Sequence, residues 1–421
     1  MNAEIRKRAS QAGMPLMDFI LSRIRQLETE SGIHRTIFAA CPNSHAVIRA
    51  ALKSAKKNNS PIKFAATLNQ VDTDGGYTRL TQQDFTNLIR REAKEIGLTG
   101  PVIVAVDHGG PWLKDIHARE KWSYHDSMQA VKRSFEAAVD AGYDLLHIDP
   151  TVDITLPKGQ IISIDVVAAR TLELIEHVEK YRKARHLPAV SYEVGTEEVH
   201  GGLADLSVFR KFLELLKTGL KSAGLAETCP CFIVGKVGTD LHTTTFDPDV
   251  ARQLTTIARE YGSVIKGHYT DGVTNPEAYP QAGMGAANIG PEFTEREYDG
   301  LMQLEQVQAN LVNIGKIFQP VEMRKALWNA VIASGRWKKW LQPGENPESF
   351  FAQSSARQEW LIKTGCRYIW ETPEVVSTRA KLYAELGNQG IDAREIVEAE
   401  IERAMDKYFS SFNLVGLNAL I

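Results

Sequence analysis

Several titratable residues stand at or just beyond the ends of short apolar segments in this sequence. Asp107-His108 ends one such segment, His268 ends another, and His242 follows a third. Imidazole nitrogens combined with a carboxylate suit a divalent transition ion, and open coordination positions would accept substrate oxygens. We therefore predict a metal site formed by His108, His242 and His268. Zn²⁺ is the expected ion, and Mn²⁺, Co²⁺ or Ni²⁺ would also suit these ligands.

Other polar residues occupy similar positions and extend the candidate site. A carboxylate that takes a hydroxyl proton is needed for acid–base chemistry, and we expect Asp107, Glu193 or Glu197 to supply it. Glu193 and Glu197 share one side of their segment if it forms a strand that long. The residues that we expect to contact substrate are Asn69, Gln70, Asp149, Asp271 and Asn288.

Phosphate-binding residues are less clearly marked. Gly75-Gly76 forms a turn by composition, its backbone N–H groups can face an anion, and Lys266 adds positive charge. The segment beginning Gly290-Pro291 opens a helix whose N-terminus is a second candidate. No GxxxxGK[ST] motif occurs, and no GxGxxG motif follows a strand-like segment. We therefore expect neither an ATP-dependent nor an NAD-dependent reaction.

The elements that must position these residues are alternating strands and helices. Continuous Val/Ile/Leu/Ala segments are typical of parallel strands buried on both faces, and the segments between them carry a helical period. Eight such units favour a (β/α)8 TIM barrel, in which chemistry takes place where the strands end, over an open doubly wound sheet. The predicted strands lie within 34–42, 62–70, 101–108, 144–151, 189–198, 231–238, 263–271 and 286–294.

The sequence divides into two parts. Residues 1–319 contain the predicted barrel, preceded by a helical lead-in over 1–31. Residues 320–421 contain few strand-like segments and many charged or aromatic helical ones. We predict a helical C-terminal extension there, used for packing, as a lid or in subunit contact.

Composition restricts the partners and the compartment. A net charge of −3 offers no basic field for a nucleic-acid backbone. No apolar run reaches the length of a membrane span, and the N-terminus lacks the apolar core of a signal peptide, so we expect a cytoplasmic protein. The four cysteines are interpreted as reduced, buried thiols. Five histidines outside the strand ends are expected at the surface: His117, His125, His177, His186 and His200.

Several motifs together resemble one protein family. They are Asn69-Gln70-Val71, Asp107-His108-x-Gly-Pro111, Ser191-Tyr192-x-x-Gly195-Thr196-Glu197, His268-x-Thr270-Asp271, Gly290-Pro291-x-x-Thr294 and Arg367-Tyr368-x-Trp370. The chain is thereby similar to the GatZ/KbaZ family. That family is known as the non-catalytic subunit of class II tagatose-bisphosphate aldolase, and some members are D-tagatose 6-phosphate 4-epimerases.

A more distant similarity connects the sequence with class II, metal-dependent aldolases. Those enzymes place an Asp-His pair on strand 3, a Glu on strand 5, metal-binding histidines after strands 6 and 7, and an Asn on strand 8. The sequence has matching residue types at all these places. It departs from the pattern after His268, because Tyr269-Thr270-Asp271 replaces the glycine-rich loop that receives the C1 phosphate. The resemblance therefore implies a ketose that carries only a 6-phosphate.

These expectations combine into a functional hypothesis. The protein is expected to interconvert D-tagatose 6-phosphate and D-fructose 6-phosphate by metal-dependent retro-aldol and aldol chemistry at C3–C4. The alternatives are a stabilising, non-catalytic subunit that binds a class II aldolase catalytic subunit, and an epimerase that acts on a related ketose. We expect a ketose phosphate as substrate and allow for a homo-oligomer.

Overall fold

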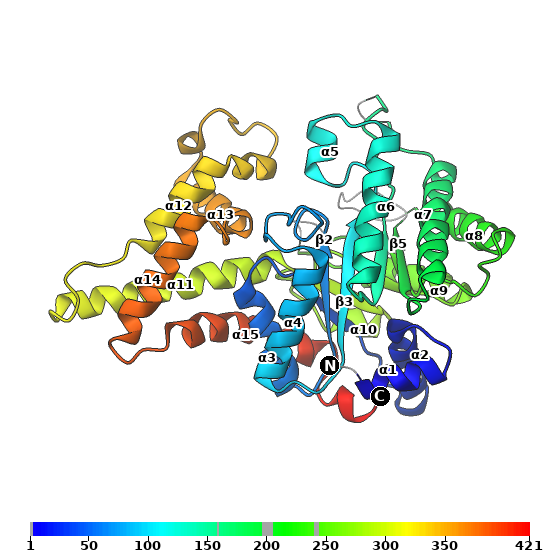
Figure 1. Ribbon diagram of the computed structural model, residues 1–421, viewed down its shortest axis with the longest axis horizontal. Helices are drawn as coiled ribbons and strands as arrows, with labels where there is room; N and C mark the ends of the chain where they lie inside the picture. The colour runs from blue at the N-terminus through cyan, green and yellow to red at the C-terminus, as the bar shows by residue number, and fades with distance from the viewer. Residues whose placement is uncertain (1–2, 158–159, 196–204, 240–243) are drawn as a thin grey trace.

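A computed structural model describes residues 3–157, 160–195, 205–239 and 244–421, and in it eight parallel strands close into a barrel (Figure 1). The strands pair in chain order, and β8 closes the barrel against β1. The predicted TIM barrel is confirmed, and the open sheet is excluded. The strands are β1 (Ile37–Ala40), β2 (Ile62–Thr67), β3 (Val102–Gly109), β4 (Leu145–Ile148), β5 (Ser191–Gly195), β6 (Phe232–Val234), β7 (Val264–Gly267) and β8 (Ala286–Ile289).

Helices cover the outside of the barrel, and local capping explains where several of them begin. The Asp247 side chain accepts the first free N–H groups of α9, which has Pro248 at its first position. Thr81 and Asp84 form a capping box at the start of α4. The covering helices are α3 (His45–Lys57), α4 (Gln82–Ile96), α6 (Tyr124–Asp140), α7 (Ile164–Ala184), α8 (Leu206–Ser222), α9 (Pro248–Glu260) and α11 (Pro291–Asn313), with the short α5 (Asp115–Arg119) and α10 (Ala278–Gln281).

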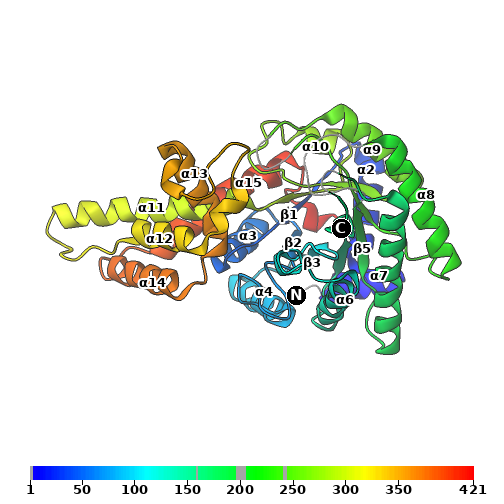
Figure 2. The same cartoon turned by 90° about the horizontal axis from the view of Figure 1, so that it is seen from above.

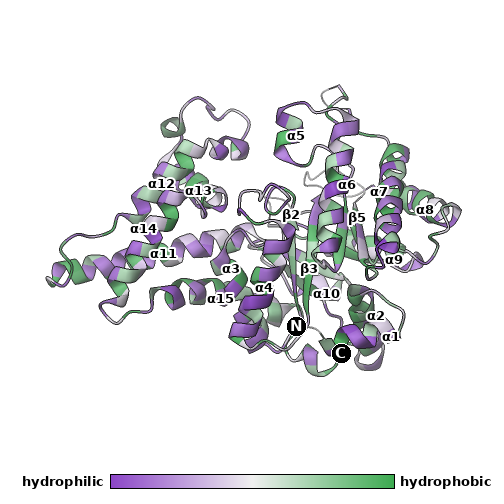
Figure 3. Ribbon diagram, viewed as in Figure 1, coloured by the Kyte–Doolittle hydropathy of each residue, from purple (hydrophilic) through white to green (hydrophobic). Residues whose placement is uncertain are grey.

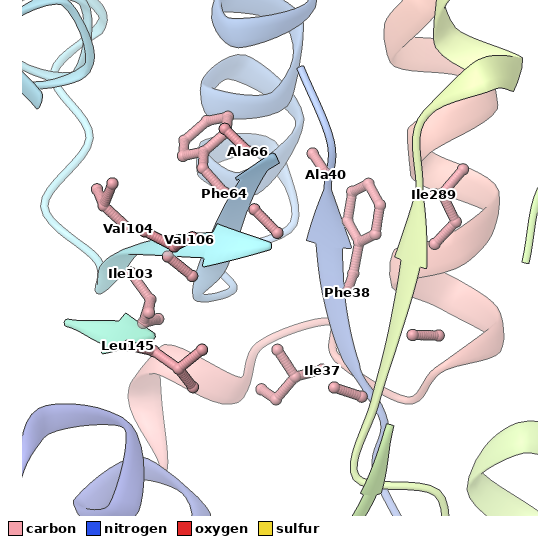
Figure 4. Packing of buried hydrophobic residues seen from close by; sticks show 14 of the residues in the cluster. Ile37, Phe38, Ala40, Phe64, Ala66, Ile103, Val104, Val106, Leu145 and Ile289 are labelled. Atoms are coloured by element: carbon pink, nitrogen blue, oxygen red, sulfur yellow. The ribbon is translucent and has the colours of Figure 1, made fainter. Parts of the chain in front are cut away.

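Apolar side chains account for much of the burial of the strands, and charged residues such as Lys63 and Glu193 are buried inside the barrel as well. The aliphatic and aromatic residues labelled in Figure 4 interdigitate between β1, β2, β3, β4 and β8, and Phe38 and Phe64 are fully buried. Polar residues remain on the outer side, so the outward face of α4 is largely hydrophilic (Figure 3). The lead-in helices α1 (Ala3–Gln11) and α2 (Leu16–Ser31) lie at one end of the barrel, where Arg8 donates to the carbonyl of Ile421.

The last hundred residues form a lobe beside the barrel. Helix α11 runs outward, and the lobe is built on it (Figure 2). The helix α15 then returns beside α11 and packs on α3, so Tyr408 and Phe409 contact Phe38 of β1. The further elements are α12 (Met323–Ser334), η1 (Arg336–Trp340), η2 (Phe350–Ala352), α13 (Ser355–Gly365), η3 (Cys366–Tyr368), α14 (Pro373–Gly387), α15 (Ala393–Ser411) and η4 (Leu417–Ala419). The predicted boundary between 319 and 320 falls in the loop before α12.

Two expectations about exposure are wrong. His117 is buried and stacks on Trp122, with ring centroids 4.5 Å apart; the turn after α5 brings them together, and the backbone N–H of Trp122 donates to the His117 carbonyl at 2.9 Å. Cys229 is exposed and Cys41 half-buried, whereas Cys231 and Cys366 are buried. All four cysteines lie within the described residues and are free thiols. None of the described helices has the length and apolar character needed to cross a membrane.

Candidate metal centre and cavity

The end of β3 has an unusual backbone that positions Asp107 and His108. His108 has a φ of +46°, and the pairing of β3 with β4 shifts register between Val106 and Gly109. Gly109 is required here, because a Cβ atom would lie 2.4 Å from the Phe135 ring. The same Cβ atom would lie 3.0 Å from the carbonyl oxygen of His147, so the end of β3 lies close against the end of β4. Strain of this kind persists where surrounding contacts hold it, and it is typical of functional sites.

Four side chains gather at the carboxyl ends of β3, β4 and β7. Asp107, His108, His147 and His268 each offer a ligand atom, and these atoms lie within 4.8 Å of one another. His147 Nε2 and His268 Nε2 are buried without a hydrogen-bond partner among the described residues. Buried polar atoms are normally paired, so orphaned imidazole nitrogens beside a carboxylate fit a bound divalent cation.

Neighbouring residues fix the orientation of the His108 ring. Its Nδ1 donates to Asp149 Oδ2 at 2.6 Å, and Thr151 donates to the other oxygen of that carboxylate at 2.5 Å. The Nε2 atom is thereby directed toward Asp107, 4.0 Å away. A carboxylate behind a histidine sets the tautomer and the ring orientation in many metal sites. Asp149, expected to contact substrate, instead supports His108.

A layer of buried charges lies next to this cluster inside the barrel. Lys266 Nζ is 3.2 Å from Asp107 Oδ1 and 2.5 Å from Glu193 Oε1, and Lys63 Nζ is 3.1 Å from the other Glu193 oxygen. Burial would raise the pKa of Asp107, but Lys266 and His108 hold it well below its usual range. Lys266 and Lys63 do the same for the pKa of Glu193. Both carboxyl groups are therefore ionised at neutral pH.

The pKa values of two imidazoles in the cluster shift in opposite directions. Burial, together with the charges of His108 and Lys266, lowers the pKa of His268 to about 3, so this ring is neutral and able to ligate a metal. Burial also opposes the protonation of His108, but Asp107 and Asp149 outweigh it and raise its pKa. A metal ion bound at the cluster would displace the added proton from the His108 ring, because a histidine ligand must be deprotonated.

The predicted ligands and catalytic residues are only partly brought together. His108 and His268 lie side by side, with ring centroids 4.4 Å apart, and Asp107 lies between them and Lys266. His242 and Glu197 lie outside the described residues, so their roles stay predictions. Glu193 is fully buried and faces the lysines rather than the cavity.

His147 completes the described cluster and was not among the predicted metal ligands. The His147-Ile148-Asp149 pattern at the end of the β4 segment is the signal that could have identified it. Its Nδ1 lies 3.3 Å from Asp107 Oδ1 and 3.2 Å from Glu193 Oε1. It therefore joins the cluster to the buried charge layer.

The residues expected to contact substrate have different surroundings. Asn288 donates to Asp107 Oδ2 at 3.0 Å, and its own Oδ1 is buried without a described partner. Asn69 lines the cavity but uses its amide to hold the backbone of Leu113 and Asp115. Gln70 is buried, and its Nε2 donates to the carbonyl of Pro42 and to Asn43 Oδ1. Asn288 is thus the amide best placed to meet a ligand beside the cluster.

Asp271 occupies the start of α11. Its Oδ1 accepts the backbone N–H groups of Gly290 at 2.9 Å and Glu292 at 2.8 Å. Burial, with a contribution from the Glu292 carboxylate, raises the pKa of Asp271 to about 7. The helix N-terminus that was a candidate phosphate site therefore already has a carboxylate of the same chain.

A cavity of about 570 Å³ opens over the cluster. Its floor includes Asp107, His108, His268 and Asn288 from the barrel. The opposite wall comes from η1 and η3 of the C-terminal lobe, whose contribution was not predicted. The predicted phosphate residues Gly75, Gly76 and Lys266 do not line it: Lys266 is buried in the charge layer, and a Cβ atom on Gly76 would lie 2.4 Å from the carbonyl oxygen of Gln70. The lobe contributes Arg336, Lys339, Trp340, Arg367 and Tyr368.

The fold and the cluster define a class: a TIM-barrel protein with a metal-compatible histidine and carboxylate site at the carboxyl ends of its strands. Residues 21–408 match the model of one family, described as D-tagatose-1,6-bisphosphate aldolase subunit GatZ/KbaZ-like. The chain belongs to this family, and the resemblance found in its motifs is confirmed.

Named relatives carry two different functional descriptions. A protein of Salmonella paratyphi B named D-tagatose-1,6-bisphosphate aldolase subunit GatZ is 24% identical over 380 residues, which cover 85% of this chain and 86% of the relative. A protein of Agrobacterium fabrum named D-tagatose 6-phosphate 4-epimerase is 25% identical over 380 residues, which cover 84% and 85%. The family thus includes proteins named as an aldolase subunit and as an epimerase.

Solved structures share the fold. One, described as a "probable tagatose 6 phosphate kinase" from Sinorhizobium meliloti, has a TM-score of 0.71 at 21% identity and covers 90% of this chain and all of that one. A fructose-bisphosphate aldolase from Campylobacter jejuni has a TM-score of 0.55 at 14% identity, with 95% and 94% coverage. At these identities the similarity concerns the architecture alone.

Proposed function

We propose that this protein is a metal-dependent D-tagatose 6-phosphate 4-epimerase that forms D-fructose 6-phosphate. The observation that carries the proposal is the cluster of Asp107, His108, His147 and His268, which has two orphaned imidazole nitrogens and of which all but the buried His147 line the cavity. A protein that only stabilised a partner would not need such a set of buried, partly unsatisfied groups. The name of the Agrobacterium fabrum relative supports the same activity.

The chemistry follows from the position of the inverted carbon. C4 of a 2-ketose is β to the carbonyl, so its hydrogen is not acidic, and no nucleotide motif is available for transient oxidation. Cleavage of the C3–C4 bond remains, with the bonding electrons passing to C3 and the C2 carbonyl. A divalent ion held by the histidines would act as a Lewis acid for the negative charge that develops there.

Asp107 is positioned to move the proton in this reaction. Its carboxylate is kept ionised by Lys266 and lines the cavity, so it can take the C4 hydroxyl proton as the bond breaks. The aldehyde half then rotates and presents its opposite face. The C3 carbon re-adds to C4, and Asp107 returns the proton to the new hydroxyl oxygen. Glu197 stays an alternative base.

The surroundings of Asp271 favour a monophosphate over a 1,6-bisphosphate. Its carboxylate accepts the N–H groups of Gly290 and Glu292, which would otherwise be free to bind a phosphate at the start of α11. A C1 phosphate brought to this point would meet both a filled site and an acidic side chain. Epimerisation of a ketose without a C1 phosphate avoids that repulsion.

The second candidate function is a non-catalytic aldolase subunit. The observation that favours it is the name of the Salmonella paratyphi B relative, and it fits family membership equally well. A non-catalytic role would leave the cluster of Asp107, His108, His147 and His268 without a function in this chain.

One incubation separates these functions. The purified chain alone is mixed with D-tagatose 6-phosphate and Zn²⁺, Mn²⁺ or Co²⁺, and the sugars are resolved by chromatography. We expect D-fructose 6-phosphate, and no conversion after treatment with a chelator. Triose products alone would indicate an aldolase. No conversion unless a class II aldolase is present, with the chain increasing that enzyme's activity, would support the subunit role instead.

A further inference from the structure

The cavity wall formed by the C-terminal lobe carries an excess of positive charge. Arg336, Lys339 and Arg367 all line the cavity, and we call these three residues the cationic wall. Asp115 pairs with two of them, at 2.5 Å from Arg336 Nη2 and 3.0 Å from Lys339 Nζ. Arg367 has no ion pair with any described residue. Among direct ion pairs, one carboxylate faces three cations, so the wall carries an excess of positive charge; Asp271 and Glu295 interact with Arg367 only at longer range.

Several hydrogen-bond donors of this wall lack acceptors. Arg367 is only 8% exposed, and its Nε donates to the carbonyl of Thr364 at 2.9 Å. Its Nη2 is buried without a partner among the described residues, and the same holds for Arg336 Nε and for Nε1 of the neighbouring Trp340, which also lines the cavity. An unpaired buried donor on a charged group is costly, and a ligand with several acceptor oxygens would remove that cost.

Aromatic stacking holds the two guanidinium groups in place. The Arg336 guanidinium lies 4.2 Å from the centre of the Tyr368 ring, and that of Arg367 lies 4.8 Å from the centre of the Trp340 ring. These two rings are themselves nearly parallel, at 15°. Tyr368 also packs edge-on against Tyr77 of the barrel, which joins the wall to the rest of the site. The arginines are thus pre-organised, as planar recognition of a phosphate requires.

We propose that the cationic wall binds the C6 phosphate of the ketose substrate. The inference rests on the proposed function and deepens it, because it assigns the group that distinguishes a sugar phosphate from a free sugar. The wall lines the same cavity as Asp107, His108 and His268 of the metal cluster, and its excess of positive charge suits a phosphate dianion. After C3–C4 cleavage the aldehyde half retains this phosphate. The wall therefore holds the half that must rotate without being released.

Binding of a substrate analogue tests the wall independently of turnover. D-Glucitol 6-phosphate has the six carbons and the phosphate but no carbonyl, so it cannot undergo retro-aldol cleavage. Titration calorimetry with the metal-depleted full chain should give an affinity at least about 10-fold higher for wild type than for Arg367→Gln or Lys339→Met. Lys338→Met is the matched control, because Lys338 is adjacent and exposed but does not line the cavity.

Unchanged binding of D-glucitol 6-phosphate by Lys339→Met and a folded Arg367→Gln overturns the inference. If Arg367→Gln does not fold, Arg336→Gln takes its place beside Lys339→Met. In turnover, the variants should release more triose per fructose 6-phosphate than wild type, which a purely structural role would not produce. If the wall binds the analogue but the chain converts no tagatose 6-phosphate, the proposed function alone fails. If the chain epimerises tagatose 6-phosphate while the variants bind D-glucitol 6-phosphate as wild type does, only the assignment of the wall as the phosphate site is refuted.

Discussion

Replacement of Lys266 by methionine tests whether this residue belongs to the buried charge layer or to a phosphate site. Lys266 is fully buried and bridges two carboxylates, Asp107 at 3.2 Å and Glu193 at 2.5 Å. Removing one partner of a buried ion pair typically costs about 3–5 kcal/mol, because the remaining charge has no counter-ion. The variant should therefore lose about this much free energy of unfolding, and Lys338→Met, at an exposed position, should lose almost none.

The loss should depend on pH in a defined direction. In the wild type, Lys266 depresses the pKa of both carboxyl groups, so their stabilising contribution is present above the unfolded values near 4 and is lost only at lower pH. Without Lys266, one folded-state pKa should rise above its unfolded value, and the variant's stability should fall as pH increases from about 4 through that raised pKa. The gap between the two proteins should therefore widen from pH 5 to pH 8.

Urea unfolding of chelator-treated protein, followed by tryptophan fluorescence at pH 5 and pH 8, measures this gap. Adding Glu193→Gln to Lys266→Met should recover part of the lost stability, because Lys63 and Asp107 then remain as balanced charges. A destabilisation below about 1 kcal/mol, together with weaker binding of D-glucitol 6-phosphate, would refute the assignment and return Lys266 to the phosphate site.

Three further predictions concern the cluster and a distant carboxyl group. His268→Ala and His242→Ala should each lose bound metal and turnover while remaining folded, with the exposed His125→Ala as control; metal retained in both variants by elemental analysis would contradict the site. His147→Gln should weaken metal affinity by about 10-fold or more, measured by competition with a chelating dye, and unchanged affinity would remove it from the ligand set. Burial raises the pKa of Glu297 to about 7, so its favourable contribution is complete below the unfolded pKa near 4.3 and is lost as pH rises through 7. Glu297→Gln should flatten the fall in melting temperature between pH 5 and pH 8, and an unchanged slope would show that this carboxyl group does not titrate as stated.

The barrel could be predicted because its signals are local. Each strand is a short apolar segment and each helix has its own periodicity, so the order of elements is readable without knowledge of their contacts. Helix starts such as Asp247-Pro248 are equally local. The convergence of Asp107, His108 and His268 followed from the rule that parallel strands of a barrel end on one rim.

Other parts of the site depend on tertiary geometry that the sequence does not display. Lys266 precedes His268 by two residues, yet the inward turn of its side chain and its carboxylate partners from β3 and β5 are properties of the closed barrel. The role of Asp271 at α11 depends on the packing of the loop after β7 against the end of β8. Arg367 reaches the cavity because α11 carries the lobe outward and the following helices fold back.

The central claim is that this chain by itself inverts C4 by breaking the C3–C4 bond. The most direct measurement uses D-tagatose 6-phosphate deuterated at C4, incubated in ordinary water with the metal-loaded chain alone and followed by NMR. We predict D-fructose 6-phosphate that retains deuterium at C4 and forms without a primary isotope effect, because no C–H bond breaks. Loss of deuterium to water, a several-fold isotope effect, or no conversion without a partner aldolase would contradict the account.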